Sequence, residues 1–275
     1  TLFRGRIVFR TPMLWFMGFL TTFTIGGMTG VLLSIPGANF QLHNSLFLVA
    51  HFHNMIIGGV VFGFFAGFTY WFPKIAGFTL DERLGRYAFW TWIAGFLTAF
   101  MPLYVLGLMG MTRRLSTIPA ESGWHPLLVV AAIGACIIAA ALALQVLQLI
   151  VSIRDRRKRI EADPWNGRTL EWATASPAPE YNFAIIPRVH GRDALLMLKE
   201  GRAKQPEPHY EDIEMPRNSG LGFIIAALSL CFGFGMVWHL WWLAALGIVG
   251  IIICLISRSF DEHIEYTIPA AEVAR

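Results

Sequence analysis

Six long apolar runs constrain the fold of this chain more than any other feature. A helix that crosses a bilayer needs about 20 such residues, and it satisfies its own backbone hydrogen bonds in lipid. The chain is also 55% hydrophobic and only 15% charged, which is too apolar for a soluble domain. The sequence therefore predicts an all-α membrane protein with about six transmembrane helices, in the segments Thr11–Ile35, Ser45–Tyr70, Tyr87–Met111, Pro126–Ile153, Ser219–Val237 and Leu240–Ser257.

This pattern predicts three parts. Residues 1–153 hold four helices, residues 154–217 form a polar connection, and residues 218–275 hold a two-helix hairpin and a tail. Half of the prolines of the chain fall in the connection, and prolines at this density disfavour long helices and sheets. We expect an extended strap there, with Trp165 and Trp172 lying against protein or lipid.

The basic residues predict the orientation of the helices. If the six segments alternate, one side of the membrane receives Arg4, Arg6, Arg10, Lys74, Arg83, Arg86, Arg154, Arg156, Arg157, Lys158 and Arg159. The other side receives only Arg113 and Arg114. Cytoplasmic loops of membrane proteins carry the excess of Lys and Arg, so the strap and the C-terminus are predicted to be cytoplasmic. Membrane orientation explains these charges, and nucleic acid is not predicted as a partner.

Two imidazoles, His51 and His53, stand inside the uncharged segment Ser45–Tyr70. Residues two apart on a helix are separated by about 200° of rotation, so these rings should point to opposite faces. Shared metal ligands on one helix stand three or four residues apart, so two separate cofactors flanking the helix fit this spacing better than one metal. The alternative is that each ring only hydrogen-bonds to a neighbouring helix.

Arg113 and Arg114 are unexpected on a side that is otherwise poor in positive charge. Lipid phosphates would neutralise them, and so would the carboxylates of a cofactor, which suit the guanidinium fork. His51 belongs to the same side of the membrane. A haem bound through its iron to a histidine, with propionates reaching the arginines, would use both features. His43 precedes that helix and, beside Asn44, is either an exposed loop residue or a contact to the same cofactor or to a hard cation.

Two stretches of the chain resemble subunit I of the haem-copper terminal oxidases. They are His43–Asn54, which contains Ala50-His51-Phe52-His53, and Gly110–Arg114. The runs Gly26–Gly30, Tyr70–Pro73 and Thr169–Trp172 are similar to that family as well. The resemblance extends over essentially the whole chain but covers only the C-terminal portion of such a subunit. It implies that the helices form part of the subunit I bundle.

The resemblance implies a role for each residue of the pair and for the residue between them. His51 would be the proximal ligand of the high-spin haem, of o or a type, where oxygen is reduced. His53 would be one axial ligand of the low-spin haem, of b type, that delivers electrons to it. Phe52 would lie between the two haems. Arg113 and Arg114 would bind haem propionates, with His43 close to them.

Within the family the sequence is most similar to the bo3-type quinol oxidases. Asn44 stands where cytochrome c oxidases generally have the Asp of an outer magnesium site, and residues 101–104 and 238–242 also resemble the quinol branch. The expected function is electron transfer from quinol to oxygen coupled to proton translocation. The alternatives are a cytochrome c oxidase subunit I fragment, a non-catalytic di-haem electron carrier, and a structural module with vestigial histidines.

The copper ligands of the family are not in this sequence, and neither is the second histidine of the low-spin haem. The chain also begins without Met. We therefore expect it to work with an N-terminal portion of subunit I that supplies the copper site, and with oxidase subunits II, III and IV. The expected surroundings are membrane lipids in the bacterial inner membrane, and the expected substrates are quinol and oxygen.

Overall fold

The computed structural model describes residues 2, 7–155, 163–204 and 207–274. Arg4, Arg6 and residues 156–159, which contribute to the predicted orientation, lie outside the described residues. The chain divides into two compact units, Thr1–Pro179 and Glu180–Arg275. The division into three parts that composition suggests stays a prediction, because the boundary between the two units falls inside the predicted strap.

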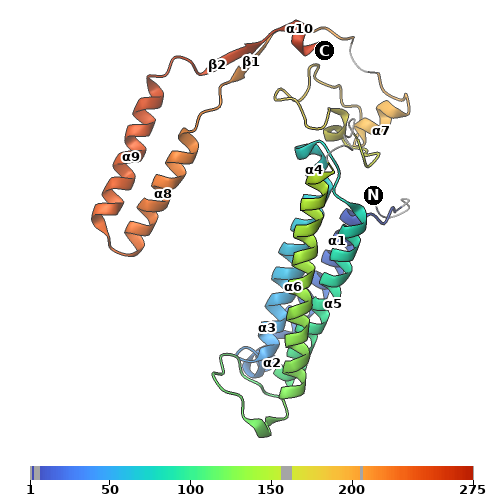
Figure 1. Cartoon of the computed structure of the whole chain (residues 1–275), viewed down its shortest axis with the longest axis vertical. Coiled ribbons are helices and arrows are strands. Elements are labelled where there is room, and N and C mark those ends of the chain that lie inside the picture. The colour runs from blue at the N-terminus through green and yellow to red at the C-terminus, as the bar shows by residue number, and fades with distance from the viewer. Residues whose placement is uncertain (1, 3–6, 156–162, 205–206, 275) are drawn as a thin grey trace. The chain divides into compact units, whose positions relative to one another are not determined.

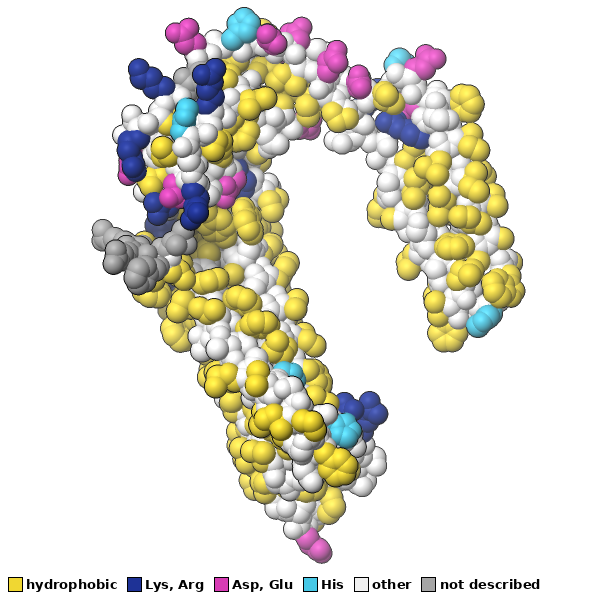
Figure 2. All heavy atoms as spheres, turned by 180° about the vertical axis from the view of Figure 1, so that it is seen from behind, with side chains coloured by type: hydrophobic (Ala, Val, Ile, Leu, Met, Phe, Trp, Pro, Cys, Tyr) yellow, Lys and Arg dark blue, Asp and Glu magenta, His cyan; other side chains and the backbone are white. Residues whose placement is uncertain are grey.

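The first unit is a bundle of four long helices (Figure 1). They are α1 (Thr11–Ser34), a continuous helix made of α3 (Leu46–His53), the π-helix η1 (Asn54–Val61) and α4 (Phe62–Ala76), then α5 (Glu82–Leu108) and α6 (His125–Arg154). Two short elements lie in the connections between them, α2 (Pro36–Leu42) and η2 (Ala120–Ser122), and a third, η3 (Leu170–Ala173), lies in the strap after α6. Figure 2 shows hydrophobic side chains along the bundle and charged ones near its ends.

The helices confirm the predicted fold class. Within the part of the chain that the structure describes, five helices are long and apolar enough to cross a membrane: Thr11–Ser34, Leu46–Ala76, Glu82–Leu108, His125–Arg154 and Trp241–Ser259. The remaining predicted segment, Ser219–Val237, is the apolar helix α8 (Leu221–Val237), which has 17 residues and is a little shorter than the others. It ends there because the chain turns at Trp238 and His239, and His239 takes a left-handed φ of 58°.

Two helices extend beyond the apolar runs that predict them. Helix α5 begins at Glu82 rather than Tyr87, because the Asp81 carboxylate caps it by accepting the Leu84 N–H at 2.8 Å. Helix α4 continues past Tyr70 to Ala76 and ends where Gly77 takes a φ of 75°. Apolar composition marks the part of a helix that suits the membrane, whereas capping residues mark where the helix ends.

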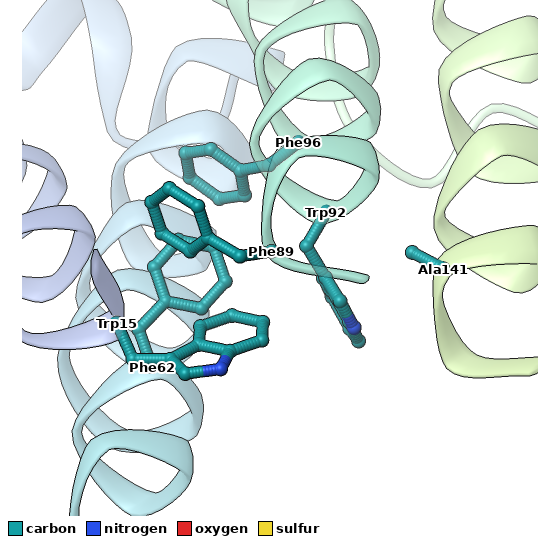
Figure 3. Close-up of a cluster of buried hydrophobic side chains, with 6 residues drawn as sticks. All are labelled: Trp15, Phe62, Phe89, Trp92, Phe96 and Ala141. Carbon is teal, nitrogen blue, oxygen red and sulfur yellow. The ribbon is translucent and has the colours of Figure 1, made fainter. Parts of the chain in front are cut away.

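An aromatic cluster holds the four long helices together (Figure 3). Its buried members are Trp15 of α1, Phe62 of α4, Phe89, Trp92 and Phe96 of α5, and Ala141 of α6. The Trp15 and Phe89 rings meet edge to face, with centroids 5.2 Å apart. Because lipid is as apolar as these side chains, tight packing rather than escape from water stabilises such a cluster in a membrane.

Glycines allow the helix backbones to approach closely. A Cβ on Gly134 of α6 would lie 2.2 Å from the backbone nitrogen of Ala99 on α5, and one on Gly107 of α5 would lie 2.1 Å from the Phe47 nitrogen on α3. Both partner atoms are backbone atoms, which cannot rotate away. These two contacts therefore set the distances from α5 to α6 and to α3.

We expect Gly134→Ala to force α5 and α6 apart. Overpacking of this kind should lower the free energy of unfolding by about 1–3 kcal/mol. The measurement is the unfolding midpoint of the purified protein in detergent, followed by circular dichroism. Gly27→Ala on α1 is the matched control, because a Cβ on Gly27 meets nothing within 4 Å. Equal midpoints for the two variants would contradict the close approach of α5 and α6.

The strap begins by packing against the end of α4. The Lys74 ammonium donates to the carbonyl oxygens of Thr174 at 2.7 Å and Ala175 at 2.9 Å. Trp172 is buried, and its indole N–H donates to the Tyr70 hydroxyl at 2.8 Å. The indole N–H of Trp165 donates to the Tyr70 carbonyl at 2.9 Å. Both tryptophans therefore lie against protein.

Removing the Lys74 charge should loosen this segment. Lys74→Met removes two hydrogen bonds from a charged donor, and the two carbonyl groups must then bond to water instead. We expect this to lower the stability of the strap's packing against α4 by about 1 kcal/mol or more. Chymotryptic cleavage after Trp172 should then be faster by about fivefold or more. Lys204→Met, at an exposed lysine of the second unit, is the charge-matched control. An unchanged cleavage rate in Lys74→Met would mean that other contacts hold the strap.

The second unit contains a helical hairpin and a small ribbon. Its helices are α7 (Ala194–Lys199), α8 (Leu221–Val237), α9 (Trp241–Ser259) and α10 (Ala270–Val273). Strands β1 (Ile213–Pro216) and β2 (Glu265–Ile268) pair antiparallel, with Ile213 opposite Ile268. The ribbon joins the chain before α8 to the chain after α9. Sequence reasoning missed it, because four-residue strands carry almost no pattern.

Candidate functional site

His51 and His53 lie in the last turn of α3 and contact different helices. The Nδ1 atom of His51 is 3.1 Å from the Gly26 carbonyl oxygen and 3.0 Å from the Thr29 hydroxyl, both on α1. The His53 ring stacks on Phe100 of α5 with centroids 4.4 Å apart and an interplanar angle of 20°. The two rings thus diverge as the helical rotation predicts.

In both imidazoles the Nδ1 atom is hydrogen-bonded to a backbone carbonyl. The His53 Nδ1 lies 2.7 Å from the Val49 carbonyl oxygen, as the His51 Nδ1 lies beside that of Gly26. A carbonyl oxygen can only accept, so in both rings Nδ1 carries the hydrogen and donates it. The proton on Nδ1 leaves a lone pair on Nε2, and this is the usual arrangement of a histidine that binds a metal.

Room for the His51 ring comes from a glycine, and its support comes from a hydroxyl network. A Cβ on Gly30 would lie 2.9 Å from the His51 Cε1 atom. The Thr29 hydroxyl is hydrogen-bonded to His51 and lies 3.1 Å from the Tyr104 hydroxyl of α5. Three helices therefore orient one imidazole. Sequence reasoning missed the roles of Thr29 and Tyr104, although a lone tyrosine in an apolar segment is a signal that could have pointed to one of them.

A π-helix starts immediately after the pair. Asn54, its first residue, is completely buried, and its amide donates to the Ala50 carbonyl at 3.0 Å. Gly58 in the same turn region packs against Thr22 of α1 with no room for a Cβ. Wider π turns often occur at functional sites. The pattern of apolar residues did not predict this one, because hydrophobicity does not distinguish a π turn from an α turn.

The loop before α3 and the loop after α5 lie side by side. Ser45 and Thr112 form an isolated antiparallel bridge. Next to it, Arg113 donates from its backbone N–H to the Asn44 carbonyl and from Nε to the Asn44 side-chain oxygen, each at 3.1 Å. Arg114 takes a left-handed φ of 67°. The structure thus brings Arg113 to the residue that follows His43.

Among the residues that the structure describes, Arg113 and Arg114 have no carboxylate partner. His43 is exposed, with Nδ1 3.1 Å from the Asn39 carbonyl oxygen. Phe52 stacks beside His53, with ring centroids 4.4 Å apart. The guanidinium groups are therefore available to an anionic group from outside this chain.

The described residues also limit what kind of metal centre this chain can form alone. They contain no group of three or more His, Cys, Asp or Glu side chains that could hold a metal ion. Each imidazole of the pair can contribute one nitrogen to a separate centre. This donor set fits the axial position of a haem iron, where the porphyrin itself provides the other ligands, and does not fit a closed structural zinc site.

Comparisons with known proteins identify relatives of this chain. The family described as "Cytochrome C and Quinol oxidase polypeptide I" matches residues 1–137. "Cytochrome bo(3) ubiquinol oxidase subunit 1" of Buchnera aphidicola subsp. Acyrthosiphon pisum is 57% identical over 280 residues, and "Ubiquinol oxidase subunit 1" of Acetobacter aceti is 54% identical over 282. "Probable cytochrome c oxidase subunit 1" of Bradyrhizobium diazoefficiens is 52% identical over 281 residues.

All three relatives match 100% of this chain, and the match covers 42% of the length of each of them. The chain spans less than half of the curated relatives, and it corresponds to their C-terminal portion. The similarity continues through the strap and the terminal hairpin, beyond the part matched by the family description. The sequence of the chain, its membrane helices and its diverging histidines all lead to the same conclusion: the chain belongs to the cytochrome c and quinol oxidase polypeptide I family.

Proposed function

We propose that this chain is the C-terminal portion of the catalytic subunit of a respiratory quinol oxidase. It supplies haem ligands for electron transfer from quinol to oxygen coupled to proton translocation. The observation that carries the proposal is the pair of imidazoles at the end of α3. Each has Nδ1 bonded to a backbone carbonyl and Nε2 left for a metal, and the rings of His51 and His53 contact different helices.

In this proposal each histidine holds one haem. His51 is the proximal ligand of the high-spin haem, of o or a type, and His53 is an axial ligand of the low-spin haem, of b type. When bound, the haem iron supplies electron transfer and oxygen binding. The contribution of the chain is orientation: Gly26 and Thr29 hold the His51 ring, Val49 holds His53, and Phe52 lies in the short stretch between them.

The arginine corner, which consists of Arg113 and Arg114 in the loop after α5, supports the same assignment. Arg113 and Arg114 would bind haem propionates, which are carboxylates, through the planar donor fork of the guanidinium group. Asn44 holds the Arg113 side chain at Nε, so its terminal nitrogens can turn to a propionate. His43 would lie close to those groups on the same side. Arginines without a carboxylate partner among the described residues suit this role.

The electron donor is proposed to be quinol. Two of the three relatives above are described as ubiquinol oxidases, and one as a probable cytochrome c oxidase. Asn44 in place of an acidic residue favours the quinol branch. A cytochrome c oxidase subunit I fragment is the alternative, and the relative from Bradyrhizobium diazoefficiens is the observation that supports it.

The rest of the assembly lies outside this chain. We propose that an N-terminal portion of subunit I supplies the copper ligands and the second low-spin haem ligand, and that subunits II, III and IV complete the oxidase. The predicted segments of the bundle contain no Asp, Glu, Lys or Arg. The proton-transfer carboxylates or lysines therefore lie mostly in the N-terminal portion. The strap and C-terminus are proposed to face the cytoplasm of a bacterial inner membrane.

The test is a reduced-minus-oxidised optical spectrum, recorded with and without carbon monoxide. Membranes should contain this chain alone or together with the N-terminal portion of a relative's subunit 1. One haem that responds to carbon monoxide and one that does not, present only in the combination, would support the proposal. A combination without haem would refute the catalytic assignment, and two haems without copper would identify a di-haem electron carrier.

Replacing the two histidines should have opposite effects in that combined preparation. His51→Ala should remove the carbon-monoxide-sensitive haem and leave the low-spin spectrum, because only the Nε2 of His51 is proposed to bind the first iron. His53→Ala should remove the low-spin haem and leave the carbon-monoxide-sensitive haem. His263→Ala, at an exposed residue of the second unit, is the control for loss of an imidazole. Equal loss of both haems in either variant would contradict separate ligation.

A single methyl group near His51 should disturb one haem only. Gly30→Ala would place its Cβ 2.9 Å from the His51 ring, and this strain of about 1 kcal/mol or more should lower retention of the carbon-monoxide-sensitive haem about fivefold. Gly27→Ala on the same helix, where a Cβ meets nothing within 4 Å, should retain both haems. Normal retention in Gly30→Ala would show that the ring has room to move.

A further inference from the structure

The hydroxyl group of Tyr104 on α5 is connected to the His51 imidazole through one intermediate residue. It lies 3.1 Å from the Thr29 hydroxyl, which is itself 3.0 Å from the His51 Nδ1 atom. The Tyr104 ring packs edge to face against Phe47 of α3, with centroids 4.9 Å apart. About one turn further along α5, Gly107 approaches Phe47 too closely to carry a Cβ. The Tyr104 hydroxyl is therefore held in place by packing on both sides of the α3–α5 contact.

The distances in this network determine which group donates each hydrogen. The Thr29 hydroxyl lies 2.8 Å from the Gly26 carbonyl oxygen, which can only accept, so Thr29 gives its single hydrogen to Gly26. The Tyr104 hydroxyl must then donate to the Thr29 oxygen, because that oxygen has no hydrogen left to give. The His51 Nδ1–H points between two acceptors, the Gly26 carbonyl and the Thr29 oxygen. The Thr29 oxygen thus accepts two hydrogen bonds and donates one.

Tyr104 and His51 therefore compete for the oxygen of Thr29. Hydrogen bonds that share an atom polarise one another, by about 10–30% of the strength of each bond. The bond from Tyr104 makes the Thr29 oxygen a weaker acceptor for His51, and it makes Thr29 a stronger donor to the Gly26 carbonyl, the second acceptor of His51. Both effects weaken the hydrogen bond that the His51 Nδ1 donates. A weaker bond at Nδ1 leaves less electron density for the Nε2 atom to give to a metal.

We propose that Tyr104 is a positioning residue for His51, which acts through Thr29 and lowers the donor strength of the His51 Nε2 atom. The inference rests on the proposed function, in which His51 binds the iron of the high-spin haem. A weaker donor nitrogen stabilises ferric iron less, because the hydrogen bonds around an axial ligand help to set the reduction potential of a haem. The Tyr104 hydroxyl therefore raises the potential of the haem that receives the electrons.

The test is the iron–histidine stretching band in the resonance Raman spectrum of the reduced chain, combined with the N-terminal portion of a relative's subunit 1. A high-spin haem with one axial histidine gives this band, so it reports on His51. Tyr104→Phe keeps the ring that packs on Phe47 and removes only the hydroxyl. The band should move to higher frequency, and the midpoint potential of the carbon-monoxide-sensitive haem should fall. Tyr87→Phe, at an exposed tyrosine of the same helix, should leave both unchanged.

Variants of Thr29 separate this role from a purely structural one. In a Thr29→Val chain, Tyr104→Phe should shift the band no further, because Thr29 carries the effect. Thr29→Ser, which keeps the hydroxyl, should keep the band of the unaltered chain.

Four results would overturn the proposal while haem ligation stands: an unmoved or lowered band in Tyr104→Phe, the same shift with and without Thr29→Val, a shifted band in Thr29→Ser, or loss of the carbon-monoxide-sensitive haem in Tyr104→Phe. If the unaltered combination itself gives no iron–histidine band, the proposed function fails together with this inference.

Discussion

Every backbone N–H and C=O group in the apolar runs of this chain has to find its partner within the helix or in a neighbouring helix, because lipid offers none. Long helices follow from that requirement. It also gives special weight to the few polar side chains inside the runs, since each must bond to something nearby. The structure shows how this is done: His53 and Asn54 bond to carbonyls one turn earlier on their own helix, whereas His51 bonds to α1.

The same requirement explains how α6 is attached at the end of the bundle. The Gln148 amide donates to the Asp81 carbonyl at 2.9 Å, and the Asp81 N–H donates to the Ser152 hydroxyl at 2.8 Å. Gln145 donates to the Gln148 side chain at 3.0 Å. All three α6 side chains are buried. Polar contacts of this kind join membrane helices where apolar contact alone provides little discrimination between partners.

The candidate site combines a rigid part and an exposed part. The His51 imidazole is held by groups from α1 and, through Thr29, is connected to Tyr104 on α5. Such support fixes the direction of the free ring nitrogen. A side chain needs a fixed direction to hold a metal in one geometry. The arginine corner instead rests on two paired loops. The guanidinium groups of its arginines can adapt to an anionic partner.

The sequence by itself determined the membrane class, the positions of the long helices, the opposite faces of His51 and His53, and the family, because hydrophobic runs, helical rotation and a contiguous motif are local properties. The roles of His43, Phe52, Arg113 and Arg114 stay proposals. Only the tertiary structure decided that Gly26 and Thr29 orient His51, that Asn44 holds Arg113, and that the strap packs on Tyr70 and Lys74. Those contacts join residues far apart in the chain, so no local pattern records them, and the same is true of the close helix approaches at Gly107 and Gly134.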